Sequence, residues 1–330
     1  MMAHSNGCPI LTVVVPCYNE EEVLVETTLR LSTMLRGLVA NKQISSLSTV
    51  LYVDDGSNDR TWEYISEFNL KYPEISGLKL ARNVGHQNAL LAGLLHAKET
   101  ADCVISIDSD LQDDVEVIPE FISKFKEGND IVYGVRSDRS TDTLFKRKSA
   151  IAFYKVLSWF GVNLVFNHAD YRLMSKRALN GLERYREVNL FLRGIVPLIG
   201  YKSTEVYYER NKRFAGESKY PLKKMISFAL DGVTSFSISP IRFITMIGIS
   251  FFLLSLITAV YVLVSKFNGN AVSGWPSLMI SIWFIGGVQL ISLGLIGEYI
   301  GKIYKEVKGR PKYTEEIKLD ALVLKVDQAQ

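Results

Sequence analysis

Four carboxylates lie within the segment DSDLQDD at residues 108–114, directly after CVISI at residues 103–107. The apolar run is typical of a buried parallel strand, and ligands of open α/β sheets bind just beyond the carboxyl ends of such strands. Asp108 and Asp110 are two residues apart and can face one crevice, where a hard divalent cation would neutralise them. The same segment can instead cap a helix near Val117, since Asp113 and Asp114 favour a helix N-terminus.

The predicted strand before this segment belongs to a repeating pattern in residues 10–135. Strands are predicted at residues 11–15, 49–53, 78–80, 103–107 and 131–133, and helices at residues 21–36, 60–72, 88–96 and 117–127. This alternation predicts an α/β fold, with a mostly parallel sheet and helices on both of its faces.

Polar residues follow the first strand, where ligand-binding residues are expected. Tyr18 can stack on a base, Asn19 can cap the next helix, and Glu20 and Glu21 favour its first turn. No GxxxxGK[ST] motif occurs in the sequence and no GxGxxG follows this strand, so a kinase or a dinucleotide-binding protein loses its main support. What remains is a nucleotide held through acids and a metal ion.

The second and third strands end in similar polar segments. Asp54 and Asp55 can accept hydrogen bonds from a base N–H or a ribose hydroxyl, and Ser57 or Asp59 can cap the helix that follows. After the third strand, Arg82 lies beside a glycine turn and suits a phosphate or the orientation of the acids.

Composition excludes several classes of protein. A net charge of +3 over 330 residues is too small to indicate nucleic-acid binding. The three cysteines form no CxxC pair and indicate a reducing environment, and the four histidines show no zinc-like grouping. Residues 10–15 are apolar but short and lack a basic leader, so we expect a strand there and not a signal peptide.

Two apolar windows, at about residues 243–265 and 275–297, contain no Asp, Glu, Lys or Arg. Each exceeds the roughly 20 residues that cross a bilayer core, and the short linker predicts a hairpin with both chain ends on one side. The linker holds one cation, Lys266, and five follow the second window: Lys302, Lys305, Lys308, Arg310 and Lys312. This asymmetry predicts that the catalytic part and the tail are cytoplasmic. The alternative is a buried helical hairpin in a soluble protein.

Four motifs follow the predicted strands in order: YNEE at residues 18–21, DDGS at 54–57, RNVG at 82–85 and DSDLQD at 108–113. Together they resemble the inverting GT-A glycosyltransferases, and more narrowly the polyprenyl-phosphate glycosyltransferases, which include dolichol-phosphate mannose synthases and bactoprenol glucosyltransferases. The likeness runs from about Leu11 to Tyr313. The double span, with VQLISLG at 288–294 and GEY at 297–299, is similar to the bactoprenol branch.

The resemblance implies a Rossmann-like GT-A domain, interfacial helices and a two-helix transmembrane hairpin. We expect a cytoplasmic catalytic domain at residues 1–235, including amphipathic interfacial stretches at about 144–165 and 221–235. The hairpin is expected at 236–305 and a cytoplasmic C-terminal tail at 306–330. The amphipathic stretch at 144–165 can equally be an ordinary core-facing helix.

The resemblance also implies a role for each matching residue. The nucleotide would be bound by Pro16, Tyr18, Glu20, Asp54, Asp55, Arg82 and Asp108. Asp110 and Gln112 would bind Mg²⁺ or Mn²⁺, with Asp108 as a further candidate ligand, and the ion would stabilise charge on the leaving nucleoside diphosphate. Acceptor or diphosphate binding would fall to Arg136, Arg139, Arg172, Arg210, Arg213, Ser218 and Lys219.

Asp110 and Asp170 are the expected catalytic residues. Asp170 lies in HADYRL at residues 168–173, which matches the acid-aromatic-Arg element of the family, and it is the candidate base. A phosphate monoester has its second pKa near ~6, so the acceptor is largely ionised at cytosolic pH. We therefore hypothesise that Asp170 orients the acceptor or the sugar more than it removes a proton.

A basic segment at residues 202–224 contains seven cations and three acids. Residues 210–220 resemble the mobile acceptor loop of the family, whose Arg and Lys side chains would screen the repulsion between two phosphorylated substrates. Lys223 and Lys224 fit better as a solvated basic face near anionic lipid. Gly297 and Gly301 form a GxxxG motif, which suggests helix packing between subunits of a homo-oligomer.

Together with the resemblance, these features predict an inner-membrane enzyme that moves a hexose, with glucose as the first candidate, from a UDP-sugar to undecaprenyl phosphate on the cytoplasmic face, with inversion. The expected partners are the nucleotide-sugar, the polyprenyl phosphate, the bilayer, a second copy of the chain, a flippase and a downstream glycosyltransferase, and no nucleic acid. One alternative is a dolichol- or polyprenyl-phosphate mannosyltransferase that uses GDP-mannose. Another is a membrane scaffold that binds nucleotide-sugars and is catalytically silent. A processive polysaccharide synthase is disfavoured, because QxxRW is absent and two spans cannot build a translocation channel.

Overall fold

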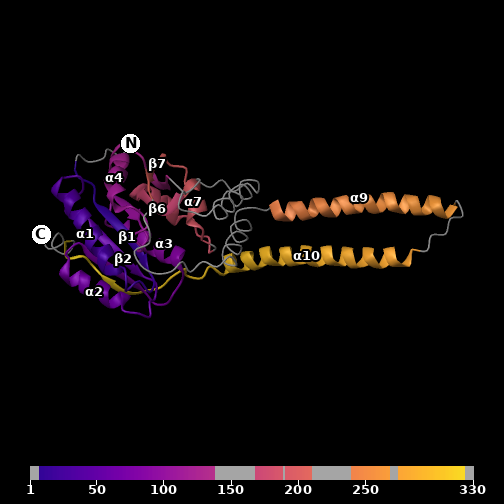
Figure 1. The fold of residues 1–330 in the computed structure, drawn as a ribbon, viewed down its shortest axis with the longest axis horizontal. Coiled ribbons are helices and arrows are strands. Elements are labelled where there is room, and N and C mark those ends of the chain that lie inside the picture. The colour runs from indigo at the N-terminus through magenta and orange to yellow at the C-terminus, as the bar shows by residue number, and fades with distance from the viewer. Residues whose placement is uncertain (1–6, 138–167, 189, 210–238, 268–273, 324–330) are drawn as a thin grey trace. The chain divides into compact units, whose positions relative to one another are not determined.

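An eight-stranded sheet is the centre of the region that carries the acidic segment. The computed structural model describes residues 7–137, 168–188, 190–209, 239–267 and 274–323. The strand order is β7-β5-β6-β4-β1-β2-β3-β8, and Figure 1 labels β1, β2, β6 and β7 of this sheet. The strands are β1 (Leu11–Cys17), β2 (Thr49–Asp54), β3 (Ile75–Leu80), β4 (Cys103–Ser106), β5 (Ile131–Arg136), β6 (His168–Ser175), β7 (Ser203–Tyr208) and β8 (Glu315–Leu319). Strands β4, β1, β2 and β3 are parallel to one another, whereas β6 and β8 run antiparallel to their neighbours.

Helices cover both faces of this sheet, which confirms the predicted α/β class. They are α1 (Leu24–Ala40), α2 (Thr61–Lys71), α3 (His86–Ala97), the 3-10 turn η1 (Val115–Val117), α4 (Ile118–Lys126), α6 (Lys176–Glu183) and α7 (Leu192–Leu198). All seven residues of β1 are buried, as expected for a strand covered on both sides. On the α3 face, a Cβ on Gly93 would lie 2.5 Å from a methyl carbon of Val14, so glycine permits this close helix-sheet approach.

The strand register brings distant polar segments to one edge of the sheet. Cys17 at the end of β1 pairs with Asp54 at the end of β2, and Val14 pairs with Ser106 at the end of β4. Strand β6 runs the other way, with Arg172 opposite Ser106. Because Asp170 precedes Arg172 on this antiparallel strand, it too lies beyond the end of β4. We call this edge of the sheet the carboxyl edge.

Strand β8 was not predicted, because its residues were expected to form part of a plain tail. It pairs antiparallel with β3, and the Asn69 amide donates to the backbone oxygens of Ile75 (2.7 Å) and Asp320 (3.1 Å). Ala321, just after the strand, is fully buried. The chain therefore returns to the catalytic sheet after the predicted hairpin.

The described residues divide into two compact units, and the second consists of α9 (Ser239–Phe267) and α10 (Trp275–Lys308). At 1.5 Å per residue, their 29 and 34 residues give lengths of about 43 and 51 Å. Between the two helices, the rings of Phe251 and Phe284 pack edge to face, with their centroids 5.2 Å apart. Among the residues whose placement is described, one segment, Phe284–Lys308, is long and apolar enough to cross a membrane.

Candidate active site

The loops after β1 and β2 are held to each other by hydrogen bonds. Asn19, in a left-handed conformation with φ of 54°, receives a bond from the backbone N–H of Asn58 (2.9 Å) on its side-chain oxygen. Its own backbone N–H donates to Ser57 Oγ (3.0 Å). The prediction that Asn19 caps the next helix is wrong, because α1 begins only at Leu24. The interlocked loops leave Tyr18 41% exposed at the carboxyl edge.

Asp54 and Asp55 are both buried, but they make different contacts. Asp55 accepts hydrogen bonds from the backbone N–H groups of Val84 (2.7 Å) and Gly85 (2.9 Å), so it fixes the turn before α3. Asp54 accepts one bond from the Ser57 N–H (3.2 Å), and its Oδ2 has no hydrogen-bond partner among the described residues. Burial raises the pKa of both carboxyls. Of these two acids, Asp54 is therefore the one whose carboxylate can accept a hydrogen bond from a ligand.

The remaining first-strand residues and Arg82 also lie around this edge. Pro16 is buried within β1, and the backbone N–H of Glu20 donates to Thr61 Oγ1 (2.9 Å). Arg82 is exposed, and its backbone lies so close to Gly56 that a Cβ there would approach the Arg82 carbonyl carbon to 2.7 Å. Gly56 has a φ of +66°, so both its backbone and its surroundings require glycine.

The acidic loop after β4 holds Asp108, Asp110 and Gln112 partly exposed. Leu111 between them has a φ of +56° while its side chain is buried, an uncommon conformation for a branched residue. The Gln112 N–H donates to Asp110 Oδ1 (3.1 Å). Burial and the nearby charges of Asp113, Asp170 and Asp110 raise the pKa of Asp108 to about 6, although His86 acts in the opposite direction.

Asp113 holds this loop to two other strands. Its Oδ1 accepts a hydrogen bond from the Tyr208 hydroxyl (2.5 Å) at the end of β7. The same oxygen forms an ion pair with Arg136 Nη2 (3.2 Å) at the end of β5. Asp113 and Tyr208 are 1% and 3% exposed. Burial, and next the Asp113 carboxylate, raise the pKa of Tyr208, so the hydroxyl keeps its proton and donates. We call these three residues the Asp113 clamp.

Asp170 lies against two arginines. Arg172 Nη2 contacts its Oδ1 at 2.5 Å, and Arg193 Nη2 contacts its Oδ2 at 3.0 Å. Burial alone would raise the pKa of Asp170, but Arg193, Arg172 and His86 together hold it well below its usual range. Arg172 is 1% exposed, and its Nε has no partner in the described part of the chain. The two arginines thus favour the charged form of Asp170 and make it a poor proton acceptor.

His86 and Gln87, at the start of α3, connect the two acidic positions. His86 Nε2 lies 3.6 Å from Asp108 Oδ1 and 3.8 Å from Asp170 Oδ2. Gln87 donates to Asp170 Oδ2 (3.4 Å) and accepts from the Leu192 N–H (3.0 Å). The site therefore has an acidic half, around Asp108 and Asp110, and a cationic half, around Arg172 and Arg193.

Sequence reasoning missed Arg193, His86 and Gln87 as members of the site. His86 and Gln87 follow the quoted RNVG motif directly, which could have drawn attention to them, whereas nothing in the sequence singled out Arg193. Outside the described residues lie Arg139, Arg210, Arg213, Ser218, Lys219 and the stretches at 144–165 and 221–235. Of the predicted acceptor or diphosphate ligands, the structure describes Arg136 and Arg172.

The acidic half fits a divalent cation by the chemistry of its donors. Asp108, Asp110 and Gln112 offer carboxylate and amide oxygens, the ligands that Mg²⁺ and Mn²⁺ prefer. Burial, and next the neighbouring carboxylates, raise the pKa of Asp108, and a bound cation would favour its charged form. Within the described ranges, no three His, Cys, Asp or Glu side chains form a group that could hold a metal ion. Diphosphate and water would have to complete the coordination.

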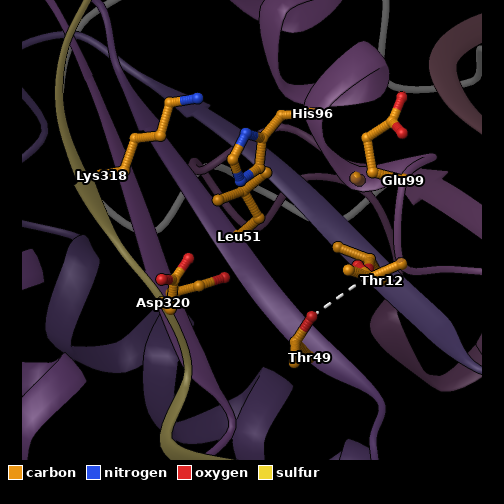
Figure 2. A pocket seen from close by; sticks show the side chains of 10 residues that line it. Thr12, Thr49, Leu51, His96, Glu99, Lys318 and Asp320 are labelled. Atoms are coloured by element: carbon orange, nitrogen blue, oxygen red, sulfur yellow. Dashed lines mark hydrogen bonds between the residues drawn. The ribbon is translucent and has the colours of Figure 1, made fainter. Parts of the chain in front are cut away.

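A separate cavity of about 220 Å³ contains none of the predicted site residues. It is lined near the amino ends of β1 and β2 by Thr12 and Thr49, whose hydroxyls are 3.1 Å apart, and by His96 and Lys318 (Figure 2). Burial and the charge of Lys318 lower the pKa of His96. The cavity lies at the opposite end of the strands from the carboxyl edge.

Residues 12–182 match the family model of glycosyl transferase family 2, and residues 239–303 match that of the GtrB C-terminal hairpin. The uncharacterized glycosyltransferase YkoT of Bacillus subtilis is 57% identical over 94% of this chain and 92% of its own length. The SfII prophage-derived bactoprenol glucosyl transferase of Shigella flexneri is 41% identical over 92% of this chain and 96% of its own length. The chain therefore belongs to glycosyl transferase family 2 and is a glycosyltransferase.

Proposed function

We propose that this glycosyltransferase moves a hexose, glucose in the first instance, from a UDP-sugar to the phosphate of a polyprenyl phosphate at the cytoplasmic face of a membrane. The supporting observation is that the acidic and cationic halves meet at His86, within 4 Å of both Asp108 and Asp170. A cation-bound diphosphate suits the first half and an anionic acceptor suits the second. The name of the Shigella flexneri relative supports the choice of glucose and lipid.

In this proposal the donor occupies the loops after β1, β2 and β4. Tyr18 would stack on the base, Pro16 and Glu20 would line its position, and Asp54 would accept a hydrogen bond from the base or the ribose. Asp55 would act indirectly, because both of its oxygens hold the turn before α3.

The diphosphate would lie over the acidic loop. A divalent cation held by Asp110 and Gln112, with Asp108 beside it, would stabilise negative charge on the departing nucleoside diphosphate. Arg82 is exposed at the same edge and suits a phosphate oxygen.

The acceptor phosphate would attack the anomeric carbon of the sugar in line with the departing diphosphate. One of its oxygens forms the new C–O bond while the bond to the donor phosphate oxygen breaks, which inverts the configuration. The acceptor is already ionised, since its second pKa is near ~6. The paired and charged state of Asp170 supports an orienting role for this residue over that of a base.

We propose that α9 and α10 cross the membrane as a hairpin and leave both chain ends in the cytoplasm. Strand β7 precedes the two helices and β8 follows them, and both strands belong to one sheet. Because the chain leaves this sheet after β7 and returns to it at β8, it must cross the membrane an even number of times, as a two-helix hairpin does. The cations at the end of α10, with Lys305 and Lys308 in its last turn, favour the cytoplasmic side.

A direct test uses purified full-length protein, undecaprenyl phosphate and a panel of labelled nucleotide-sugars, with and without a chelator. The proposal predicts one hexose on the lipid, strongest with UDP-glucose, and loss of product with the chelator. Failure of every sugar to reach the lipid would end the proposal.

A second test addresses Asp170. Asp170→Asn keeps the shape of the side chain and removes its charge. An orienting role predicts a reduced rate with a pH profile parallel to that of the wild type. An abolished rate that returns at high pH would show that Asp170 is the base.

A further inference from the structure

Three arginines, two of them in the cationic half, touch acids of the candidate site, and they differ in what they can reach. Arg172 is 1% exposed, with its guanidinium committed to Asp170 and to the Leu192 carbonyl oxygen (3.4 Å). Arg136 is 25% exposed and belongs to the Asp113 clamp. Arg193 is the most exposed, at 38% of its side chain. A ligand that enters this half would therefore meet Arg193 first.

The charges around Asp170 favour an anion beside Arg193. The guanidinium groups of Arg172 and Arg193 both lie against the single carboxylate of Asp170 there. The acidic half instead brings together the carboxylates of Asp108 and Asp110. An anionic nucleophile would be repelled by the acidic half unless its charge were neutralised, and it would be attracted to the Arg193 side.

The position of Arg193 is fixed from several directions. Asp170 engages the Nε and Nη2 edge of the guanidinium, at 3.3 and 3.0 Å. The preceding residue, Leu192, receives a bond from Arg172 on its oxygen and donates its N–H to Gln87. A planar guanidinium carries five N–H donors, and its fork matches phosphate oxygens. A preorganised arginine of this kind loses little conformational entropy on binding a phosphate.

The geometry points to Arg193 as a residue that binds the phosphate of the acceptor, with Asp170 and Gln87 holding it in place. This inference rests on the proposed function, because it assigns one contact within the same reaction. Arg193 thereby takes a role that the sequence assigned to Arg172, which is too buried to share it. The chemistry recognised is a phosphate oxyanion, and two substrates carry one: the lipid acceptor and the donor diphosphate.

The test compares Arg193→Gln and Arg193→Lys in the full-length protein with a matched control, Arg177→Gln. Arg177 on α6 is likewise a partly exposed arginine that forms a two-point contact with an aspartate, Asp130, before β5. It lies at the opposite end of the sheet from the carboxyl edge. Initial rates are measured against polyprenyl phosphate at saturating donor and against donor at saturating acceptor. Binding of UDP with Mn²⁺ and of a short-chain polyprenyl phosphate is measured without turnover.

Arg193→Gln should raise the KM for the acceptor and the Kd of the short-chain polyprenyl phosphate by roughly 10- to 100-fold. Arg193→Lys should recover part of this loss, since lysine restores the charge but not the fork. The Kd of UDP should change by less than about twofold, within the spread of neutral substitutions. Arg177→Gln should match the wild type throughout. If Arg193→Gln does not fold, the acceptor KM of Arg193→Lys decides.

Three results would overturn the assignment. An unchanged acceptor KM in a folded Arg193→Gln variant would remove the contact. A parallel rise in the Kd of UDP would assign Arg193 to the donor diphosphate, and a loss of kcat alone would make it only a support for Asp170. A wild-type protein that transfers nothing to polyprenyl phosphate would overturn the proposed function as well, so the two failures are distinguishable.

Discussion

The Asp113 clamp can be tested by removing a single oxygen. Tyr208→Phe deletes the hydroxyl that donates to Asp113 at 2.5 Å and accepts from Arg136 Nε at 3.3 Å, and it leaves the ring and the ion pair between Arg136 and Asp113 in place. The carboxylate is 1% exposed, so water cannot readily replace the lost donor. The acidic loop carries Asp110 and Gln112, and its attachment to β7 should loosen.

The expected size of this effect follows from the charge and burial of Asp113. A hydrogen bond to a charged group contributes about 1.5–3 kcal/mol. For a domain of this size, each kcal/mol corresponds to about 2–4 °C in Tm. Tyr208→Phe should therefore lower Tm by roughly 3–12 °C. If the same energy is lost from the transition state, kcat/KM for the donor falls by roughly 10- to 150-fold.

The adjacent residue supplies the control. Tyr207 is 60% exposed, and its hydroxyl donates to Glu205 (2.5 Å) on the opposite face of the same strand. Tyr207→Phe should leave both Tm and activity unchanged. Thermal unfolding in detergent and initial rates against donor concentration compare the two variants. Equal Tm values and equal rates for both variants would refute the assignment of the clamp.

Two further predictions concern the turn at Gly56 and the half-buried His96. Gly56→Ala adds a Cβ at 2.7 Å from the backbone of Arg82, at a φ of +66°, and the left-handed conformation alone costs about 1–2 kcal/mol. UDP affinity measured by calorimetry with Mn²⁺ should fall at least about tenfold, and an unchanged affinity would contradict this. Burial, with Lys318, lowers the pKa of His96 below 6.5, so the unfolded chain takes up a proton that the folded chain refuses. Stability should therefore fall as pH drops below about 6.5, and His96→Gln should lose less Tm than the wild type between pH 7 and pH 5; equal losses would contradict the assignment.

The parallel part of the fold could be predicted from the sequence because its signals are local. Residues 103–107 are apolar except for Ser106 since β4 is buried on both faces, and Asp108 follows directly at the carboxyl edge. Helix starts were less accurate. Asn19 lies in a left-handed turn bonded to Asn58, which moves the start of α1 to Leu24.

Arg193 and the Asp113 clamp could not be predicted, because they depend on contacts between distant residues. Arg193 reaches Asp170 across 23 positions, and Tyr208 reaches Asp113 across 95. Helix α7 is seven residues long and contains Pro197, so no apolar periodicity marks it. Strand β8 is short and charged, as edge strands often are, and therefore resembled a solvated tail.

In the proposed function, the acidic half drives transfer of a hexose to a lipid phosphate. The most direct measurement is mass spectrometry of the lipid after wild-type protein and Asp110→Asn have each been incubated with UDP-glucose, Mg²⁺ and undecaprenyl phosphate. We predict that the lipid gains one hexose with the wild type and that Asp110→Asn, folded and membrane-bound, yields almost none. Equal product from both proteins, or an unmodified lipid with the wild type, would contradict the account.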